Sequence, residues 1–140
     1  MGAWGVGIFQ DDSSLDWIED AYASGGPEAV RSALEDAANA SAGDYVEYDE
    51  GAAARAAAEV VAAAFGAPPE LEAGDTMDTL MEHSETVAED DDLIPLALRS
   101  IRRVAAENSE LHELWTEGED KATEWTAAIE GLETRLRGMQ

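Results

Sequence analysis

The sequence predicts an all-α protein, a single compact bundle of about six or seven helices around a central Ala-rich helix. Apolar side chains recur at helical spacing along most of the chain, and Gly, Pro or clustered acids separate these stretches. The segment most typical of a strand, residues 44–48, is short, and we interpret it as a connector. A length of 140 residues suits one domain, 1–140, which begins with a Gly- and Trp-rich non-helical arm over residues 1–11.

The arm combines glycines with the large apolar side chains of Trp4, Ile8 and Phe9. Burial of a large apolar side chain is favourable by about 1.5–3 kcal/mol. We therefore expect the arm to dock on the bundle, where its glycines allow a close approach of the backbone. These glycines do not form a dinucleotide-binding fingerprint, because their spacing is wrong and no strand precedes them.

The first two helices follow the arm directly. Ser13 and Asp16 have the spacing of a capping box, which predicts a helix that ends at the glycine pair 25–26. Pro27 suits the first turn of the next helix, which we expect to reach about Ser41. The expected core residues of these two helices are Leu15, Ile18, Tyr22, Val30, Ala33, Leu34 and Ala37.

The connector leads into the central helix. We expect Tyr45 and Val46 in the connector to point inward. The third helix, residues 50–65, carries Ala around most of its circumference, which is typical of a helix at the centre of a bundle. Only Arg55 and Glu59, one turn apart, are expected to mark an exposed edge of this helix.

The second half of the chain is expected to form the remaining helices. One starts near Asp75 or Thr76, and an acidic run separates it from a helix with Pro95 in its first turn. Ser109 is expected to cap a short helix that follows. The outer side of the Pro95 helix carries Arg99, Arg102 and Arg103. The last helix carries a regular apolar seam of Ala122, Trp125, Ile129, Leu132 and Leu136.

The chain is strongly acidic, with 32 Asp and Glu against 8 Lys and Arg and a formal charge of −24. No basic patch is present for direct binding of nucleic acid or an anionic membrane. The absence of cysteine excludes disulfides and thiol chemistry, and no apolar run is long enough for a membrane span, so we expect a cytoplasmic protein. Such acidity is also typical of adaptation to high cytoplasmic salt, which screens the repulsion.

No catalytic motif is present, so the sequence favours a non-enzymatic protein without a cofactor or a bound metal. With 32 acids in the chain, close carboxylate pairs arise by chance and single out no acid–base centre. The two histidines, His83 and His112, belong to no metal-binding motif. A joint metal site would require their helices to converge, which the sequence does not determine.

The densest charge cluster is a candidate surface for a basic partner, and it consists of Glu89, Asp90, Asp91 and Asp92. Complementary charge speeds the encounter of two proteins and selects between partners. Mimicry of nucleic-acid phosphates is one version of this hypothesis. The alternative is a solvated loop whose last Asp caps the next helix.

The opening residues MGAWGVGIFQDDSSLDW resemble the start of a bacterial and archaeal family known as domain of unknown function number 4259, whose members begin MGxWGxGxFxxDxAxDW. The matching positions are Trp4, Gly5, Gly7, Phe9, Asp12, Asp16 and Trp17, and Ser14 stands where the family usually has Ala. The segments AAAEVVAAAFG and NSELHELWTEG are similar to later parts of the family. The resemblance implies a small helical cytoplasmic protein and transfers no catalytic residue.

Three functions are compatible with these observations. The leading hypothesis is a non-enzymatic interaction module that restrains a basic partner, in the manner of an immunity protein. The second is a small-molecule or metal-binding protein that uses the Gly, Trp and Asp residues of the N-terminal motif, although these residues also suit a purely structural lock. The third is a structural domain whose acidity reflects salt adaptation alone. The apolar stripes are compatible with a monomer and with a homodimer.

Overall fold

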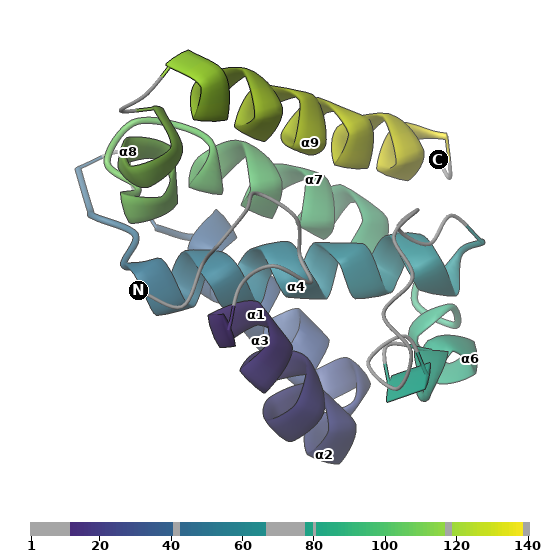
Figure 1. Cartoon of the computed structure of the whole chain (residues 1–140). Coiled ribbons are helices and arrows are strands. Elements are labelled where there is room, and N and C mark those ends of the chain that lie inside the picture. The colour runs from purple at the N-terminus through teal and green to yellow at the C-terminus, as the bar shows by residue number, and fades with distance from the viewer. Residues whose placement is uncertain (1–11, 41–42, 67–77, 80, 117–118, 139–140) are drawn as a thin grey trace.

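The structure, a computed structural model, describes residues 12–40, 43–66, 78–79, 81–116 and 119–138 (Figure 1). Most of this part of the chain is helical, which confirms the predicted all-α class. Its helices are α1 (Asp12–Asp16), η2 (Trp17–Tyr22), α2 (Ala23–Gly25), α3 (Pro27–Ala38), α4 (Tyr48–Ala64), α6 (Ser84–Val87), α7 (Leu93–Val104), α8 (Glu110–Thr116) and α9 (Glu119–Arg137). One parallel bridge joins Val46 to Ser109 across the connector.

α1, η2 and α2 form one continuous helix over residues 12–25. The predicted end of this helix is confirmed, because Gly26 has a φ of 57° and Pro27 begins α3. The predicted capping box is wrong. Ser13 lies inside the helix, where its hydroxyl donates a 3.1 Å hydrogen bond to Oδ1 of Asp49.

α4 is the central helix, as the sequence predicts, and it contacts α1, η2, α3, α6, α7, α8 and α9. In Figure 1, α7 and α9 lie on one side of α4, and the N-terminal helices lie on the other. The predicted exposed edge of α4 is wrong, because Arg55 and Glu59 are only 6% and 4% exposed. α9 covers them: the Arg55 Cζ atom lies 5.5 Å from the centroid of the Trp125 ring, and Arg135 donates to Glu59 at 2.6 Å.

The predicted core is largely confirmed. The core residues expected in the first two helices are buried, except that Leu15 is only partly buried. The seam of α9 is buried from Trp125 to Leu136. Of the two connector residues predicted to point inward, Val46 is buried, as predicted. The prediction is wrong for Tyr45, which is 42% exposed.

Two expectations about helix ends and outer faces are corrected. α3 ends at Ala38 rather than near Ser41. Arg103 does not lie free on the outer side of α7, because its guanidinium donates to the backbone carbonyls of Ala40 and Asp44, at 3.2 and 2.6 Å. These bonds tie α7 to the chain that leaves α3, so the partly buried Arg103 has a structural role at this edge of the fold.

Other expectations concern the second half of the chain. The predicted helix start near Asp75 or Thr76 lies outside the described residues, and residues 82–83 form a turn before α6. Pro95 lies in the first turn of α7, as expected. Among the described helices, none combines the length and the apolar character that a membrane span requires.

Candidate functional site

A surface groove lies where α1 and η2 meet α3 and α4. Its two adjoining hollows, of about 310 and 440 Å³, both contain the partly buried ring of Trp17. Alanines supply the rest of the apolar lining: Ala21, Ala29, Ala33 and Ala53. Exposed carboxylates form an acidic rim: Asp16, Asp20, Asp36, Asp49 and Glu50. Ser13 and Ser32 complete this surface, which we call the Trp17 groove.

The two helices that carry most of the groove are fixed to each other by buried contacts. Ile18 is fully buried, and the buried hydroxyl of Ser14 donates to the backbone carbonyl of Ala52 at 3.4 Å. Close by, the 3.1 Å bond from Ser13 to Asp49 joins the rims of the two helices. Trp17 and the Asp49 carboxylate therefore have a defined relative position in the folded chain.

A π-helical turn sets the orientation of the Trp17 ring. Residues five apart point to different faces of an α-helix, which has about 3.6 residues per turn. In the wider turn of η2, Trp17 and Tyr22 come into line and stack, with ring centroids 5.8 Å apart and an angle of 17° between the ring planes. Tyr22 is fully buried, so one face of Trp17 rests on the core while part of the ring remains accessible. Single π turns inside α-helices occur frequently at functional sites.

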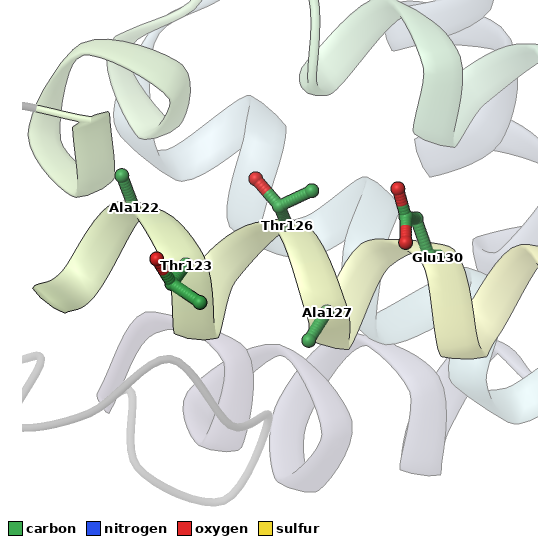
Figure 2. Close-up of a pocket in the computed structure, with 5 residues that line it drawn as sticks. All are labelled: Ala122, Thr123, Thr126, Ala127 and Glu130. Atoms are coloured by element: carbon green, nitrogen blue, oxygen red, sulfur yellow. The ribbon is translucent and has the colours of Figure 1, made fainter. Parts of the chain in front are cut away.

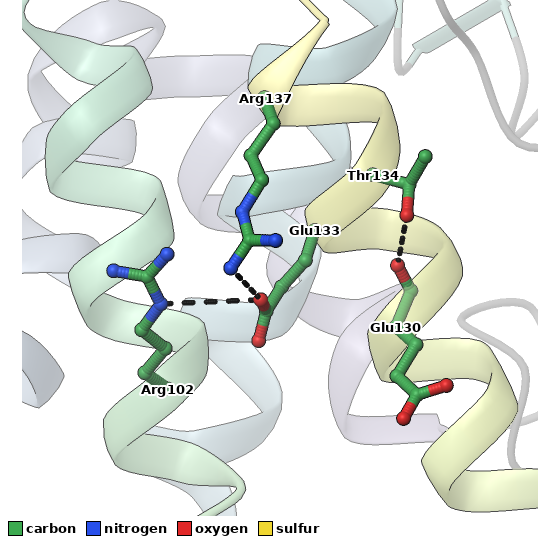
Figure 3. Close-up of polar contacts among 5 residues, drawn as sticks. All are labelled: Arg102, Glu130, Glu133, Thr134 and Arg137. Carbon is green, nitrogen blue, oxygen red and sulfur yellow. Dashed lines mark hydrogen bonds and ion pairs between the residues drawn. The ribbon is translucent and has the colours of Figure 1, made fainter.

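Among the described residues that line the groove, five are carboxylates and none is basic, so this part of the lining does not compensate its own charge. Four described arginines form ion pairs elsewhere on the molecule. In Figure 3, Glu133 accepts from Arg137 at 3.1 Å and forms a 3.9 Å ion pair with Arg102. Arg31 pairs with Asp90, and Arg135 pairs with Glu59. The acidic rim therefore faces solvent as a local negative field.

The acidic run singled out in the sequence is partly used within the fold. Asp90 accepts a hydrogen bond from Arg31 and a 3.0 Å bond from the backbone N–H of Asp92. The expected cap from Asp92 is wrong, because Asp92 is the N-cap residue of α7 but its side chain makes no capping hydrogen bond. Glu89, Asp91 and Asp92 remain exposed. Because Arg31 neutralises part of this charge, the run is a weaker candidate surface than the Trp17 groove.

The two histidines lie in different surroundings. The backbone N–H of His83 donates to the Tyr22 hydroxyl at 3.1 Å, and the His83 ring meets the Tyr22 ring edge-on at 5.2 Å. His112 instead borders a hollow of about 160 Å³ between α8 and α9, together with Trp125 and Glu130. Within the described ranges, no group of three or more potential ligands is arranged to hold a metal ion. His83 therefore has a structural place against the first helix.

A further hollow lies on the outer face of α9 (Figure 2). Its volume is about 400 Å³, and its lining consists of Ala122, Thr123, Thr126, Ala127 and Glu130. All five residues come from one helix, and Glu130 is the only charged residue among them. The described lining of this hollow therefore comes from a single element, whereas the Trp17 groove brings together polar groups from several helices.

The N-terminal motif is only partly described. Trp4, Gly5, Gly7 and Phe9 lie outside the described residues, and Asp12 begins α1. Asp16 and Trp17 both line the groove. Sequence reasoning missed Asp20, Asp36, Asp49 and Glu50 as members of the same surface. Asp20 lies one turn after Asp16, and this local spacing could have identified it. Asp36, Asp49 and Glu50 join the site only through the packing of α3 and α4.

Comparison with known proteins identifies the chain at the level of its family. The family model described as "Domain of unknown function (DUF4259)" matches residues 2–128, a span that contains the whole Trp17 groove. No curated protein and no solved structure matches the chain. The predicted family resemblance is thereby confirmed.

Proposed function

The chain belongs to the DUF4259 family, whose description assigns no activity, and we propose that it is a non-enzymatic interaction module that binds a basic protein partner through the Trp17 groove. The observation that carries this proposal is the composition of the groove. In the part of the chain that the structure describes, five exposed carboxylates and no basic residue surround a partly accessible tryptophan and short apolar side chains.

Physical chemistry supports a basic protein as the occupant. Tryptophan is enriched among the residues that dominate binding energy at protein interfaces, where it is surrounded by a polar rim. A rim of one charge sign attracts a partner of the opposite sign and raises the rate of productive encounter. The formal charge of −24 extends this attraction beyond the groove itself. A cationic side chain of the partner gains both the aromatic contact and the charge pairing at one place.

A peptide selection tests the proposal with defined probes. Displayed random peptides about 16 residues long, enough to cover part of a standard interface, are selected on the wild-type protein. Dissociation constants of the selected peptides are then measured for two triple variants. The groove variant is Asp16→Asn, Asp20→Asn and Asp49→Asn. The loop variant is Glu89→Gln, Asp91→Asn and Asp92→Asn, which removes the same charge from the other candidate surface.

We expect selected peptides to be rich in Arg and Lys, and the groove variant to bind them at least about tenfold more weakly than the loop variant does. Equal losses in both variants would show that only the overall charge attracts the peptides. A greater loss in the loop variant would place the site on the acidic run. Selection of peptides without basic residues would contradict the proposed partner chemistry.

A further inference from the structure

We infer that the Trp17 groove recognises its partner through an arginine side chain, whose guanidinium lies on the Trp17 ring between carboxylates from two helices. This inference rests on the proposed function and specifies the chemistry of the contact. It commits the groove to a guanidinium rather than to the ammonium of lysine.

The aromatic ring of Trp17 has a fixed orientation. Trp17 stacks on the fully buried Tyr22 at 5.8 Å, and Tyr22 is held in turn by the edge of His83 at 5.2 Å. A guanidinium is planar, weakly hydrated and able to stack on an aromatic face. A ring that is already immobilised loses little side-chain entropy when such a cation lies on it.

Carboxylates from two helices line the groove beside Trp17. Asp16 and Asp20 are four residues apart on the first helix, and Asp49 approaches from the first turn of α4. The hydrogen bond from Ser13 holds the Asp49 carboxylate by its Oδ1 atom at 3.1 Å, which leaves further acceptor sites on that group. Carboxylates that flank one ring from two helices suit the divergent donors of a guanidinium, which carries five N–H groups in a fixed fork.

The fold already contains an arginine on an indole ring in its interior. The Arg55 Cζ atom lies 5.5 Å from the centroid of the Trp125 ring. There the chain supplies both the guanidinium and the indole, while the Glu59 carboxylate one turn later on α4 pairs with Arg135. In the groove, the chain supplies the indole and the carboxylates on an accessible surface, next to small alanines that leave room for the apolar stem of an arginine.

The test uses small probes and nuclear magnetic resonance of the indole N–H groups. N-acetyl-L-arginine methylamide is titrated into the labelled full-length protein, in parallel with the corresponding derivatives of lysine and of citrulline, which is uncharged but similar in shape to arginine. The chain has four tryptophans, and Trp17→Phe assigns the relevant signal. Trp115 and Trp125 are buried and serve as internal controls.

We expect the arginine derivative to shift the Trp17 signal in a saturable manner, with an affinity about three- to tenfold higher than that of the lysine derivative. The citrulline derivative should cause no saturable shift, and Asp16→Asn with Asp20→Asn should abolish the arginine response. Lysine binding as tight as arginine binding, or no response of Trp17, overturns the inference. In either case, the proposed function would still hold if the groove variant bound the selected peptides more weakly than the loop variant. If it did not, both the proposed function and the arginine inference would be wrong.

Discussion

Arg135 on α9 and Glu59 on α4 form an ion pair with an N···O distance of 2.6 Å. The Glu59 side chain is only 5% exposed, against 27% for Arg135. The carboxylate therefore depends on this guanidinium for compensation of its charge in a region that water barely reaches. The pair also joins the central helix to the last helix, because the two residues lie 76 positions apart in the chain.

We expect Arg135→Met to destabilise the fold by about 3 kcal/mol, because it leaves a buried carboxylate without its cation. Urea unfolding monitored by helicity measures the loss. Arg137→Met is the matched control, because it also removes one positive charge from α9. The Arg137 side chain is 58% exposed, so its ion pair with Glu133 lies largely in water. That variant should cost less than about 1 kcal/mol.

Removal of both partners separates charge burial from lost packing. Glu59→Leu together with Arg135→Met should be more stable than Arg135→Met alone, because the double variant no longer buries a carboxylate that has lost the cation of Arg135. If the double variant is as unstable as the sum of its two single variants, the pair contributes through packing and not through its charges.

The architecture was predictable because its signals are local. Helical spacing of apolar residues, and helix ends such as the one at Gly26–Pro27, can be recognised from a few neighbouring residues. The exposed edge of α4 was predicted wrongly for the opposite reason. Charged residues such as Arg55 and Glu59 normally lie in water, and their burial depends on α9, which is contributed by a distant part of the chain.

The candidate site likewise contains residues that the sequence pointed to and residues that only the packing of distant segments brings in. Asp16 and Trp17 stood out in the sequence because they belong to a compact motif. The stacking of Trp17 on Tyr22 was not predictable from helical spacing, because it depends on a π-helical turn. Asp49 enters the site through the packing of α1 on α4, which no local pattern reports.

Two glycines should respond to alanine in opposite directions. Gly26 has a φ of 57° and a ψ of −134°, and an added Cβ would lie 3.4 Å from Cγ of His83. We expect Gly26→Ala to destabilise the fold by about 1–3 kcal/mol, because an L side chain rarely adopts this conformation. Thermal and urea unfolding provide the measurement.

Gly131→Ala is the control for this effect. Gly131 lies inside α9, and an added Cβ there meets no atom within 4 Å. Alanine should therefore stabilise the protein by about 0.5–1 kcal/mol through its higher helix propensity. A neutral or stabilising Gly26→Ala would show that the turn between the first helix and α3 adapts without strain.

The hydroxyl of Tyr45 donates a 2.8 Å hydrogen bond to Glu113, and this bond raises the pKa of Tyr45 from 10.0 to about 12. The folded state thus holds the phenolic proton more tightly than the unfolded state does. The corresponding stability is present below pH 10 and is lost as the pH rises through about 12. Phenolate absorbance during an alkaline titration should show this late step.

Two variants assign the step to Tyr45. Tyr45→Phe should remove it, and Glu113→Gln should move it down towards the ordinary tyrosine value, because the carboxylate acceptor is gone. Burial also raises the pKa of Tyr22, so that phenol should titrate above its ordinary range in both variants. A Tyr45 step that stays near 12 in Glu113→Gln would place its cause outside this hydrogen bond.

The proposed function predicts that the chain is already helical in about 0.1 M KCl, where the Debye length is about 10 Å. Its melting temperature should rise towards about 3 M KCl, because added salt screens the repulsion within a chain of charge −24. Circular dichroism over this range provides the measurement. A chain that folds only at high salt would instead show that its acidity is an adaptation to the solvent.

Asp36 combines a place on the groove rim with an unfavourable position in its helix. It lies in the last turn of α3, where the helix dipole presents negative charge, whereas Glu28 lies in the first turn of the same helix. Asp36→Asn should therefore stabilise the protein by about 0.3–1 kcal/mol in about 0.1 M KCl, while Glu28→Gln should give no such gain. Both variants remove one negative charge, so relief of the overall repulsion is the same in each.

The gain from Asp36→Asn should disappear in about 3 M KCl and should be accompanied by weaker binding of groove-selected peptides. Higher stability together with weaker binding is the result expected if Asp36 is retained for binding at a cost in stability. If Asp36→Asn and Glu28→Gln change stability equally, only the overall charge matters at these positions. If Asp36→Asn stabilises the fold without affecting peptide binding, the partner does not reach the α3 side of the groove.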